Sequence, residues 1–431
     1  MRSVGHILIV YALNLAFFVS AFAAEPPNII IVYVDDMGYG DASCLNPKSK
    51  FKTPNIDRLA KEGMTFTDGH CSDTVCTPSR YGLLTGRYSW RTTLKRGVMK
   101  AEAPCLIADG RVTLASFLRE NGYATAMVGK WHLGMDFPGT WGKRDWTQPV
   151  RDMPLDKGFD YYWGIPASMN YGVLAWFEGR FAKVPPTQYT AKKPNKVAIS
   201  DYRIKPPYTK RPPENRKPQD LEVAPDFVDI ECLDRFTTQS IKWLDGRAKA
   251  AREGKPFFLY LPYCIPHAEL TVPQDSMAPY LKLGWKEKPK IVGTGNTGGG
   301  GYGSQYKEGY CGQSHPLASY AGMISRMDRS IGKILDLLDE LKLAENTLVI
   351  FSSDNGPWLT YYDLGGTSGP WRDGKMTSWE GGFRVPGIFW WPGTIQPAVV
   401  NDIGVNVDLI STIASLTGTI LPNDRRFDAM D

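Results

Sequence analysis

The chain has 431 residues, which is enough for one large α/β domain or two medium-sized ones. Its composition is that of an ordinary globular protein, with 42% hydrophobic and 22% charged residues, and its 13 Trp and 21 Tyr fit a deep core or a carbohydrate-binding cleft. The formal net charge of +5 is mild, so the composition does not indicate the basic face of a nucleic-acid-binding protein.

The first 24 residues have the pattern of a secretory signal peptide. Arg2 is followed by an apolar run, Ile7–Val19, and then by small residues at Ala21 and Ala23. The alternative is an uncleaved anchor, but the run is short for a transmembrane span. We therefore expect residues 1–24 to be removed, a secreted or periplasmic location, and no stable membrane insertion.

Export makes disulfides possible, but the cysteines do not reveal a pairing. Their number is odd, so at least one cannot be paired within the chain; they are Cys44, Cys71, Cys76, Cys105, Cys232, Cys264 and Cys311. Free buried thiols are an equally good account of several of them.

Two predicted strands end in oxygen-bearing side chains. Ile29–Val34 is apolar on both faces, as in the centre of a parallel sheet, and Asp35 and Asp36 follow it. Leu348–Phe351 is a similar run that leads to Asp354 and Asn355. Either pair alone would also suit a turn or a helix N-cap. Ligands bind beyond the carboxyl ends of strands in open α/β sheets, and hard oxygen ligands favour calcium or magnesium over zinc.

The chain between these strands alternates between helix and strand patterns. Residues 53–66 predict a helix and then a strand, and residues 112–134 predict a helix, a strand and a loop with Lys130 and His132. Residues 255–267 predict a strand ending near His267, and residues 320–343 a long amphipathic helix. The alternation predicts an α/β fold with a large, mostly parallel sheet and helices on both faces. The acids, the lysine and both histidines then fall at one rim.

Two segments depart from this alternation. Lys183–Lys217 has ten Lys or Arg, two acids and seven Pro, and we interpret it as an extended surface excursion, solvated rather than holding a polyanion. Gly293–His315 is a glycine-rich loop without the strand–turn–helix setting of a phosphate-binding loop.

Cys76 lies in the stretch CSDTVCTPSR, residues 71–80. A disulfide with Cys71 and a conventional thiol nucleophile are two interpretations, but neither cysteine has a familiar cysteine-hydrolase context. The longer stretch CTPSRYGLLTGR, Cys76–Arg87, resembles the signature of the type I sulfatases. In that family the cysteine is oxidised to Cα-formylglycine before the chain folds. Pro78 disfavours helix at Thr77 and would keep the unfolded segment extended for the modifying enzyme.

Four further motifs resemble the same family, so the resemblance covers most of the chain. They are PNIIIVYVDDMGYGD (27–41), GYATAMVGKWHLG (122–134), TLVIFSSDNG (347–356) and DGKMTSWEGGFRVP (373–386). The resemblance implies the alkaline-phosphatase-like sulfatase fold. We expect Leu83 and Leu84 to start a helix, which would place residue 76 near its positive end, where an anion is stabilised.

The resemblance also implies the site. One calcium ion would be bound by Asp35, Asp36, Asp354 and Asn355, with an oxygen of the modified Cys76. Arg80 and Lys130 would hold the formylglycine hydrate, and His132 would contact its second hydroxyl. Lys375 and His267 would bind the sulfate and the ester oxygen. Ser168, in GFDYYWGIPASMN, matches a polar residue of the family's pocket.

These residue types suit sulfate ester hydrolysis. The cations neutralise the sulfate oxygens, one hydroxyl of the hydrate attacks sulfur, and His267 protonates the leaving alcohol. His132 then removes the proton of the other hydroxyl, and sulfate is expelled. The partners implied are a sulfated saccharide, with a small aryl sulfate as the alternative, and a formylglycine-generating or anaerobic sulfatase-maturating enzyme.

Two rival interpretations stay open. A phosphodiesterase or phosphonate hydrolase of the same superfamily typically uses two metals and more histidines than the four of the mature chain, His70, His132, His267 and His315. A truncated, non-catalytic form is the other rival. We expect the catalytic domain to span residues 25–400, and residues 401–431 to resemble the start of a C-terminal region that is incomplete.

Overall fold

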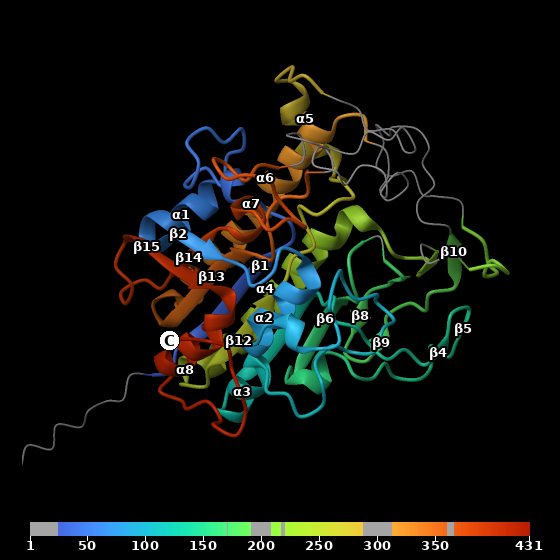
Figure 1. Ribbon diagram of the computed structural model, residues 1–431, viewed down its shortest axis with the longest axis horizontal. Helices are drawn as coiled ribbons and strands as arrows, with labels where there is room; N and C mark the ends of the chain where they lie inside the picture. The colour runs from blue at the N-terminus through green and yellow to red at the C-terminus, as the bar shows by residue number, and fades with distance from the viewer. Residues whose placement is uncertain (1–24, 170, 191–207, 217–219, 288–312, 360–365) are drawn as a thin grey trace, which may run out of the picture.

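The fold is built around one large sheet, shown in Figure 1. The computed structural model describes residues 25–169, 171–190, 208–216, 220–287, 313–359 and 366–431. Within these residues the sheet has ten strands in the order β15–β2–β14–β13–β1–β12–β3–β6–β8–β9. They are β1 Asn28–Val34, β2 Met64–His70, β3 Ala124–Lys130, β6 Tyr161–Ile165, β8 Phe177–Glu178, β9 Phe181–Ala182, β12 Phe257–Leu261, β13 Thr347–Ser353, β14 Gly387–Trp390 and β15 Ala398–Val405.

The centre of this sheet is parallel. Strands β13, β1, β12, β3 and β6 run side by side in the same direction, and β14, β8 and β9 are antiparallel to their neighbours. Every residue of β1 and of β12 is buried, as the continuous apolar runs predict for strands covered on both faces. The predicted α/β class with a mostly parallel sheet is therefore confirmed.

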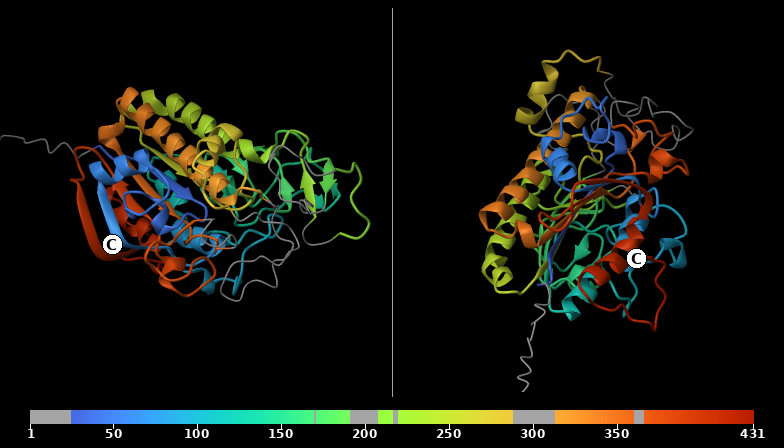
Figure 2. Two further views of the ribbon diagram at one scale, coloured as in Figure 1. Left: turned by 90° about the horizontal axis from the view of Figure 1, so that it is seen from above. Right: turned by 90° about the vertical axis from the view of Figure 1, so that its left-hand side faces the viewer.

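Helices cover both faces of the sheet (Figure 2). One layer contains α4 and α6, with α1 and α5 packed against α6, and the other contains α2, α3 and α8. The helices are α1 Pro54–Glu62, α2 Cys76–Thr85, α3 Leu114–Glu120, α4 Cys232–Arg252, α5 Gln274–Leu281, α6 Pro316–Glu340, α7 Glu380–Phe383 and α8 Leu409–Leu416. No helix among the described residues is long and apolar enough to span a membrane.

Two smaller sheets lie at the right of Figure 1. One contains β10 Gln188–Thr190, β11 Leu221–Val223 and β7 Val173–Leu174, and the other pairs β4 Gly139–Thr140 with β5 Lys143–Arg144. The described part of the basic segment Lys183–Lys217 contributes the edge strand β10. Residues 191–207 of that segment, most of Gly293–His315 and the expected signal peptide 1–24 lie outside the described residues.

One sequence expectation about the segment around Cys76 is wrong. We expected a helix to start at Leu83 or Leu84, whereas α2 begins at Cys76. Pro78 is compatible with this start because it is the third helical residue, where its missing N–H leaves no helical hydrogen bond unmade. The first amide to bond within this turn is that of Ser79, which donates to the Val75 carbonyl over 3.2 Å.

Candidate active site

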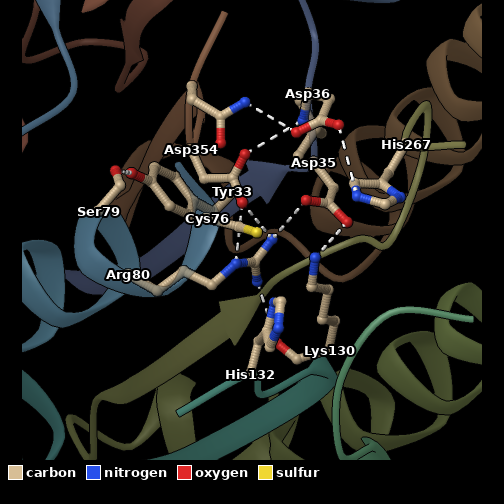
Figure 3. A network of polar contacts seen from close by, with 12 residues as sticks. Tyr33, Asp35, Asp36, Cys76, Ser79, Arg80, Lys130, His132, His267 and Asp354 are labelled. Atoms are coloured by element: carbon tan, nitrogen blue, oxygen red, sulfur yellow. Dashed lines mark hydrogen bonds and ion pairs between the residues drawn. The ribbon is translucent and has the colours of Figure 1, made fainter. Parts of the chain in front are cut away.

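The two acid-tipped strands are parallel neighbours and bring their carboxyl ends together. Val34 of β1 lies opposite Ser353 of β13, and the Asp354 amide donates to the Val34 carbonyl over 3.0 Å. Asp35, Asp36, Asp354 and Asn355 are all buried at this edge, and Figure 3 shows the three aspartates close together. The predicted convergence of the four residues is therefore what the structure shows.

The oxygens of this group fit a hard cation. The Asn355 amide donates to Asp36 Oδ1 over 2.7 Å, and the Asp36 backbone amide donates to Asp354 Oδ1 over 3.1 Å. Asp35 Oδ1, Asp36 Oδ2 and Asn355 Oδ1 are buried and have no hydrogen-bond partner among the described residues. Burying such oxygens without a partner is unfavourable, and a divalent ion with oxygen ligands would remove the penalty. The donor set suits calcium or magnesium rather than zinc.

Three cationic side chains contact the acids, and Figure 3 shows two of them, Arg80 and Lys130. Arg80 of α2 lies 2.9 Å from Asp354 Oδ2 and 3.5 Å from Asp35 Oδ1 through Nη2. Lys130, the last residue of β3, donates to Asp35 Oδ2 over 2.6 Å. Arg80 also donates to the Lys130 carbonyl over 3.0 Å, which ties α2 to the end of β3.

Lys375 is the third cation, and it reaches the site from a loop. Its ammonium donates to Asp36 Oδ1 over 2.6 Å and lies 4.0 Å from the sulfur of Cys76. Asp373 and Met376, on either side of it, have φ values of 64° and 66°, in the left-handed region that non-glycine residues seldom adopt. Trp358 packs under the ammonium, with 5.6 Å between Nζ and the ring centroid.

Cys76 occupies the centre of this group. It is 2% exposed, it is the first residue of α2, and its sulfur belongs to a set of atoms within 4.8 Å of one another that includes carboxylate oxygens of Asp35 and Asp354. Burial raises the pKa of the Cys76 thiol. The positive charges of Lys130 and Lys375 lower this pKa, and the two acids raise it further. An unmodified Cys76 is therefore a neutral thiol at neutral pH, and it is a poor nucleophile in that form.

The two ring nitrogens of His132 have different surroundings. Nε2 lies 3.1 Å from the Met99 carbonyl, so it must carry the proton, whereas Nδ1 is buried without a hydrogen-bond partner among the described residues. Burial, then Lys130 and Arg80, hold the His132 pKa well below its usual range. This imidazole is therefore neutral and has a free lone pair at Nδ1. Tyr171 packs beside it, with 5.2 Å between the ring centroids.

His267 lies next to Asp36, at the edge of the acid cluster. His267 is buried, with Nε2 3.5 Å from Asp36 Oδ2 and a hydrogen bond to the Ala268 carbonyl, and burial lowers its pKa. It follows β12 by six residues, so the strand ends earlier than we expected.

Ser168 is buried in the loop after β6, near Pro166, whose carbonyl accepts from the His132 amide over 2.9 Å. Its hydroxyl has no hydrogen-bond partner among the described residues, so no such bond joins it to the cluster.

Sequence reasoning missed a second polar network behind α2. Asn406 donates to the Tyr33 hydroxyl over 2.7 Å and to the Ser79 hydroxyl over 3.0 Å, and its side-chain oxygen accepts from the Ser72 amide over 2.9 Å. Asn406 thus holds the segment around Cys76 at two points. A lone Asn in the sequence VNVD gives no sign of this role.

Comparisons with known proteins identify the family of the chain. The family model described as Sulfatase matches residues 27–419. The N-acetylgalactosamine-6-sulfatase of Canis lupus familiaris is 32% identical over 96% of this chain and 66% of its own length. Human arylsulfatase A is 32% identical over 96% of this chain and 68% of its own, and the N-acetylgalactosamine-6-O-sulfatase of Bacteroides thetaiotaomicron is 31% identical over 95% and 76%.

Solved structures share the fold. A sulfatase structure from work on the metabolism of multiple glycosaminoglycans by Bacteroides thetaiotaomicron has a TM-score of 0.72 and 29% identity, over 95% of this chain and 81% of that one. A phosphonate monoester hydrolase of Agrobacterium radiobacter has a TM-score of 0.55 at 18% identity, over 94% and 75%, and shows the fold alone.

The chain spans about two thirds of the length of the dog and human relatives. The match of the family model covers most of the chain, and several relatives are more than 30% identical. The chain therefore belongs to the sulfatase family of sulfuric ester hydrolases.

Proposed function

We propose that the protein hydrolyses sulfate esters of a saccharide through a formylglycine made from Cys76 and one calcium ion. One observation carries this proposal: Cys76 is buried at the start of α2, between three carboxylates and three cations, in a setting that raises its thiol pKa. That position is suited to reactive chemistry, but a neutral thiol is unsuited to perform it. Conversion of the side chain resolves the conflict.

The residues of the site fit both a calcium ion and a formylglycine. Asp35, Asp36, Asp354, Asn355 and an oxygen at position 76 would hold the calcium ion, which would neutralise charge on the sulfate oxygens. A hydrated formylglycine would supply one hydroxyl to attack sulfur, and deprotonation of its second hydroxyl would re-form the aldehyde and expel sulfate from the first. Arg80 and Lys130, both beside Asp35, would keep that side chain in place.

The charges of the pocket favour an anionic ester. Three carboxylates, Asp35, Asp36 and Asp354, are balanced by Arg80, Lys130 and Lys375, and both histidines are held neutral by burial. A divalent ion would make the pocket net positive. Lys375, which now pairs with Asp36 and lies 4.0 Å from Cys76 Sγ, could then bind a sulfate oxygen.

His132 and His267 would transfer the protons of the reaction, one as a base and the other as an acid. His132 would accept a proton at Nδ1, the nitrogen for which the described residues offer no hydrogen-bond partner. An anionic ester bound beside His267 would favour its imidazolium, which could donate to the leaving oxygen. Ser168 would line the pocket beside the His132 loop.

The saccharide part of the proposal is supported by the relatives. Two of them are named for sulfated N-acetylgalactosamine, and a structural neighbour comes from work on glycosaminoglycan metabolism. We further propose an exported protein that loses residues 1–24, requires a sulfatase-maturating enzyme, and has its catalytic domain in residues 25–400.

The test compares a sulfate ester with the phosphate ester of the same alcohol. The mature protein, with calcium, should release sulfate from 4-nitrophenyl sulfate with a higher kcat/KM than phosphate from 4-nitrophenyl phosphate. Preference for the phosphate ester would instead support a phosphodiesterase or phosphonate hydrolase, and activity on neither ester would support the non-catalytic alternative.

A further inference from the structure

A second cavity shares two chain segments with the active site. It has a volume of about 580 Å³ and is lined by residues that include Thr74, Met376 and Trp379. Thr74 precedes Cys76 by two residues, and Met376 follows Lys375. The Met376 amide donates to the Thr74 carbonyl over 3.0 Å, so the two segments that present Cys76 and Lys375 to the active site also join to form a wall of this cavity.

The rim of this cavity has an aromatic ring and a cation. Trp379 is 46% exposed, and the guanidinium of Arg372 lies 3.7 Å from its ring centroid. Both residues line the cavity. Arg384, which stacks on Trp371 beside this loop, is by contrast paired with Asp68 over 2.7 Å. No carboxylate of the described residues lies within ion-pair distance of Arg372.

From this geometry we propose that the cavity is a subsite for an acidic sugar residue next to the sulfated one in an oligosaccharide. The proposal rests on the proposed function and extends it from a single sulfate ester to a neighbouring unit. Trp379 would stack on the apolar face of the sugar ring, and Arg372 would bind its carboxylate or sulfate through paired N–H donors. The size and mixed lining of the cavity suit one ring with a few oriented polar contacts.

The test measures binding of two ligands to the full chain carrying Cys76→Ala, which cannot turn them over. One ligand is a sulfated tetrasaccharide with alternating uronic acid, and the other is N-acetylgalactosamine 6-sulfate alone. We expect Trp379→Ala and Arg372→Gln each to weaken tetrasaccharide binding about tenfold and to leave the monosaccharide unaffected. Trp90→Ala is the matched control, because Trp90 is 55% exposed with Arg91 stacked 4.4 Å from its centroid, outside this cavity.

Unchanged tetrasaccharide binding in the Trp379 and Arg372 variants would overturn the subsite. So would an equal loss for both ligands, an equal loss in the Trp90 control, or no tetrasaccharide binding to the parent. Failure of the proposed function is distinguishable, because it appears in the wild-type chain as no sulfate release from 4-nitrophenyl sulfate.

Discussion

His132 shows how burial can prepare a single residue for catalysis. Its Nε2 bonds to the Met99 carbonyl, which leaves the lone pair of Nδ1 available, and its pKa is lowered by burial and nearby cations. A lowered pKa keeps the imidazole neutral as the pH falls below the usual range for histidine, near 6.5. The proposed base is therefore neutral over a wide range of pH.

We predict that His132→Gln lowers kcat for 4-nitrophenyl sulfate by about 10²- to 10⁴-fold with a smaller effect on KM, because it removes a base rather than a sulfate ligand. Any acidic limb of the wild-type kcat profile that arises from His132 should lie below pH 6.5. A pH–rate series on both proteins checks this. His70→Gln, which alters a histidine outside the cluster, should keep the wild-type profile; an acidic limb above pH 6.5 that disappears only in His132→Gln would contradict the account.

One buried oxygen of each of Asp35, Asp36 and Asn355 makes no hydrogen bond to the described residues, which leads to a prediction about metal removal. Metal is first removed from the protein with a chelator. Calcium that binds only the folded state should then raise the free energy of unfolding by about 2.7 kcal/mol when its concentration is about a hundred times Kd. Thermal or urea unfolding with and without calcium measures this. Asp36→Asn should lose most of the gain, whereas Asp328→Asn, a buried acid that bonds to Asn55 and Ile56 instead, should keep it. Equal gains in both variants would place the ion elsewhere.

At the scale of elements, the start of α2 explains how one residue is placed. The helix begins at Cys76, so residue 76 lies in its first turn, where the N–H groups and the helix dipole favour negative charge. Arg80, one turn later, points to Asp354 and to the end of β3. The sequence indicated that residue 76 lies near the positive end of a helix but not where that helix starts, because Pro78 resembles a helix breaker unless its position within the first turn is known.

Asp41 joins three elements around the site. Its carboxylate accepts from the Gly38 amide over 2.8 Å, from the Tyr320 hydroxyl of α6 over 2.7 Å and from the Thr367 amide over 2.8 Å. It thereby links the loop of Asp36 to the segment that leads to Lys375. Burial raises the pKa of Asp41 from 3.8 to about 7, against the effect of these hydrogen bonds.

The raised pKa makes the contribution of Asp41 to stability depend on pH. Between about pH 4 and pH 7 the folded chain holds a proton on Asp41 that the unfolded chain has lost, so this contribution falls as the pH rises through that window. We predict that the wild type exceeds Asp41→Asn in free energy of unfolding by more at pH 5 than at pH 8. Urea unfolding at both values measures the difference, and a larger excess at pH 8 would be the contrary result.

At the scale of the whole molecule, residues near the C-terminal end of the chain pack against elements from its N-terminal part. β15 pairs in parallel with β2, running across the division we expected at residue 400, and Asp428 binds Arg91 and the Tyr88 amide. Asn406 reaches Tyr33 of β1, 373 residues away. Residues 398–431 therefore contribute to the position of α2, although they contribute none of the proposed catalytic side chains.

We predict that Asn406→Ala destabilises the protein by about 1–3 kcal/mol, because the buried groups of Tyr33, Ser79 and Ser72 lose a shared partner. Activity should also fall, because α2 would no longer be held in its position. Chemical denaturation and sulfate release measure the two effects. Asn401→Ala, at an exposed position of β15, should change stability by no more than about 0.5 kcal/mol; an equal loss in both variants would contradict a specific role for Asn406.

The local pattern of the sequence predicted the elements better than their arrangement. The apolar runs that became β1 and β13, and the helical periods that became α3 and α6, are signals within a few neighbouring residues. The order of the strands is set by contacts between segments that are often far apart in the chain, such as β1 and β13, and no local pattern encodes it.

The same distinction applies to the site. Acids at two buried strand ends predicted a cation site from physical chemistry alone. Lys375, by contrast, would be interpreted as a solvated lysine without the family resemblance, and only the fold shows it 8% exposed against Asp36. Asn406 and the cavity beside Trp379 could not be predicted, because each depends on segments that meet only in the folded chain.

The identity of residue 76 in active protein is the most direct test of the central claim. Mass spectrometry of the peptide that contains this residue, on protein that releases sulfate from 4-nitrophenyl sulfate, distinguishes cysteine from the lighter formylglycine. We predict formylglycine, in a fraction that rises and falls with specific activity across preparations. Full activity in protein whose residue 76 is an unmodified thiol would contradict the account.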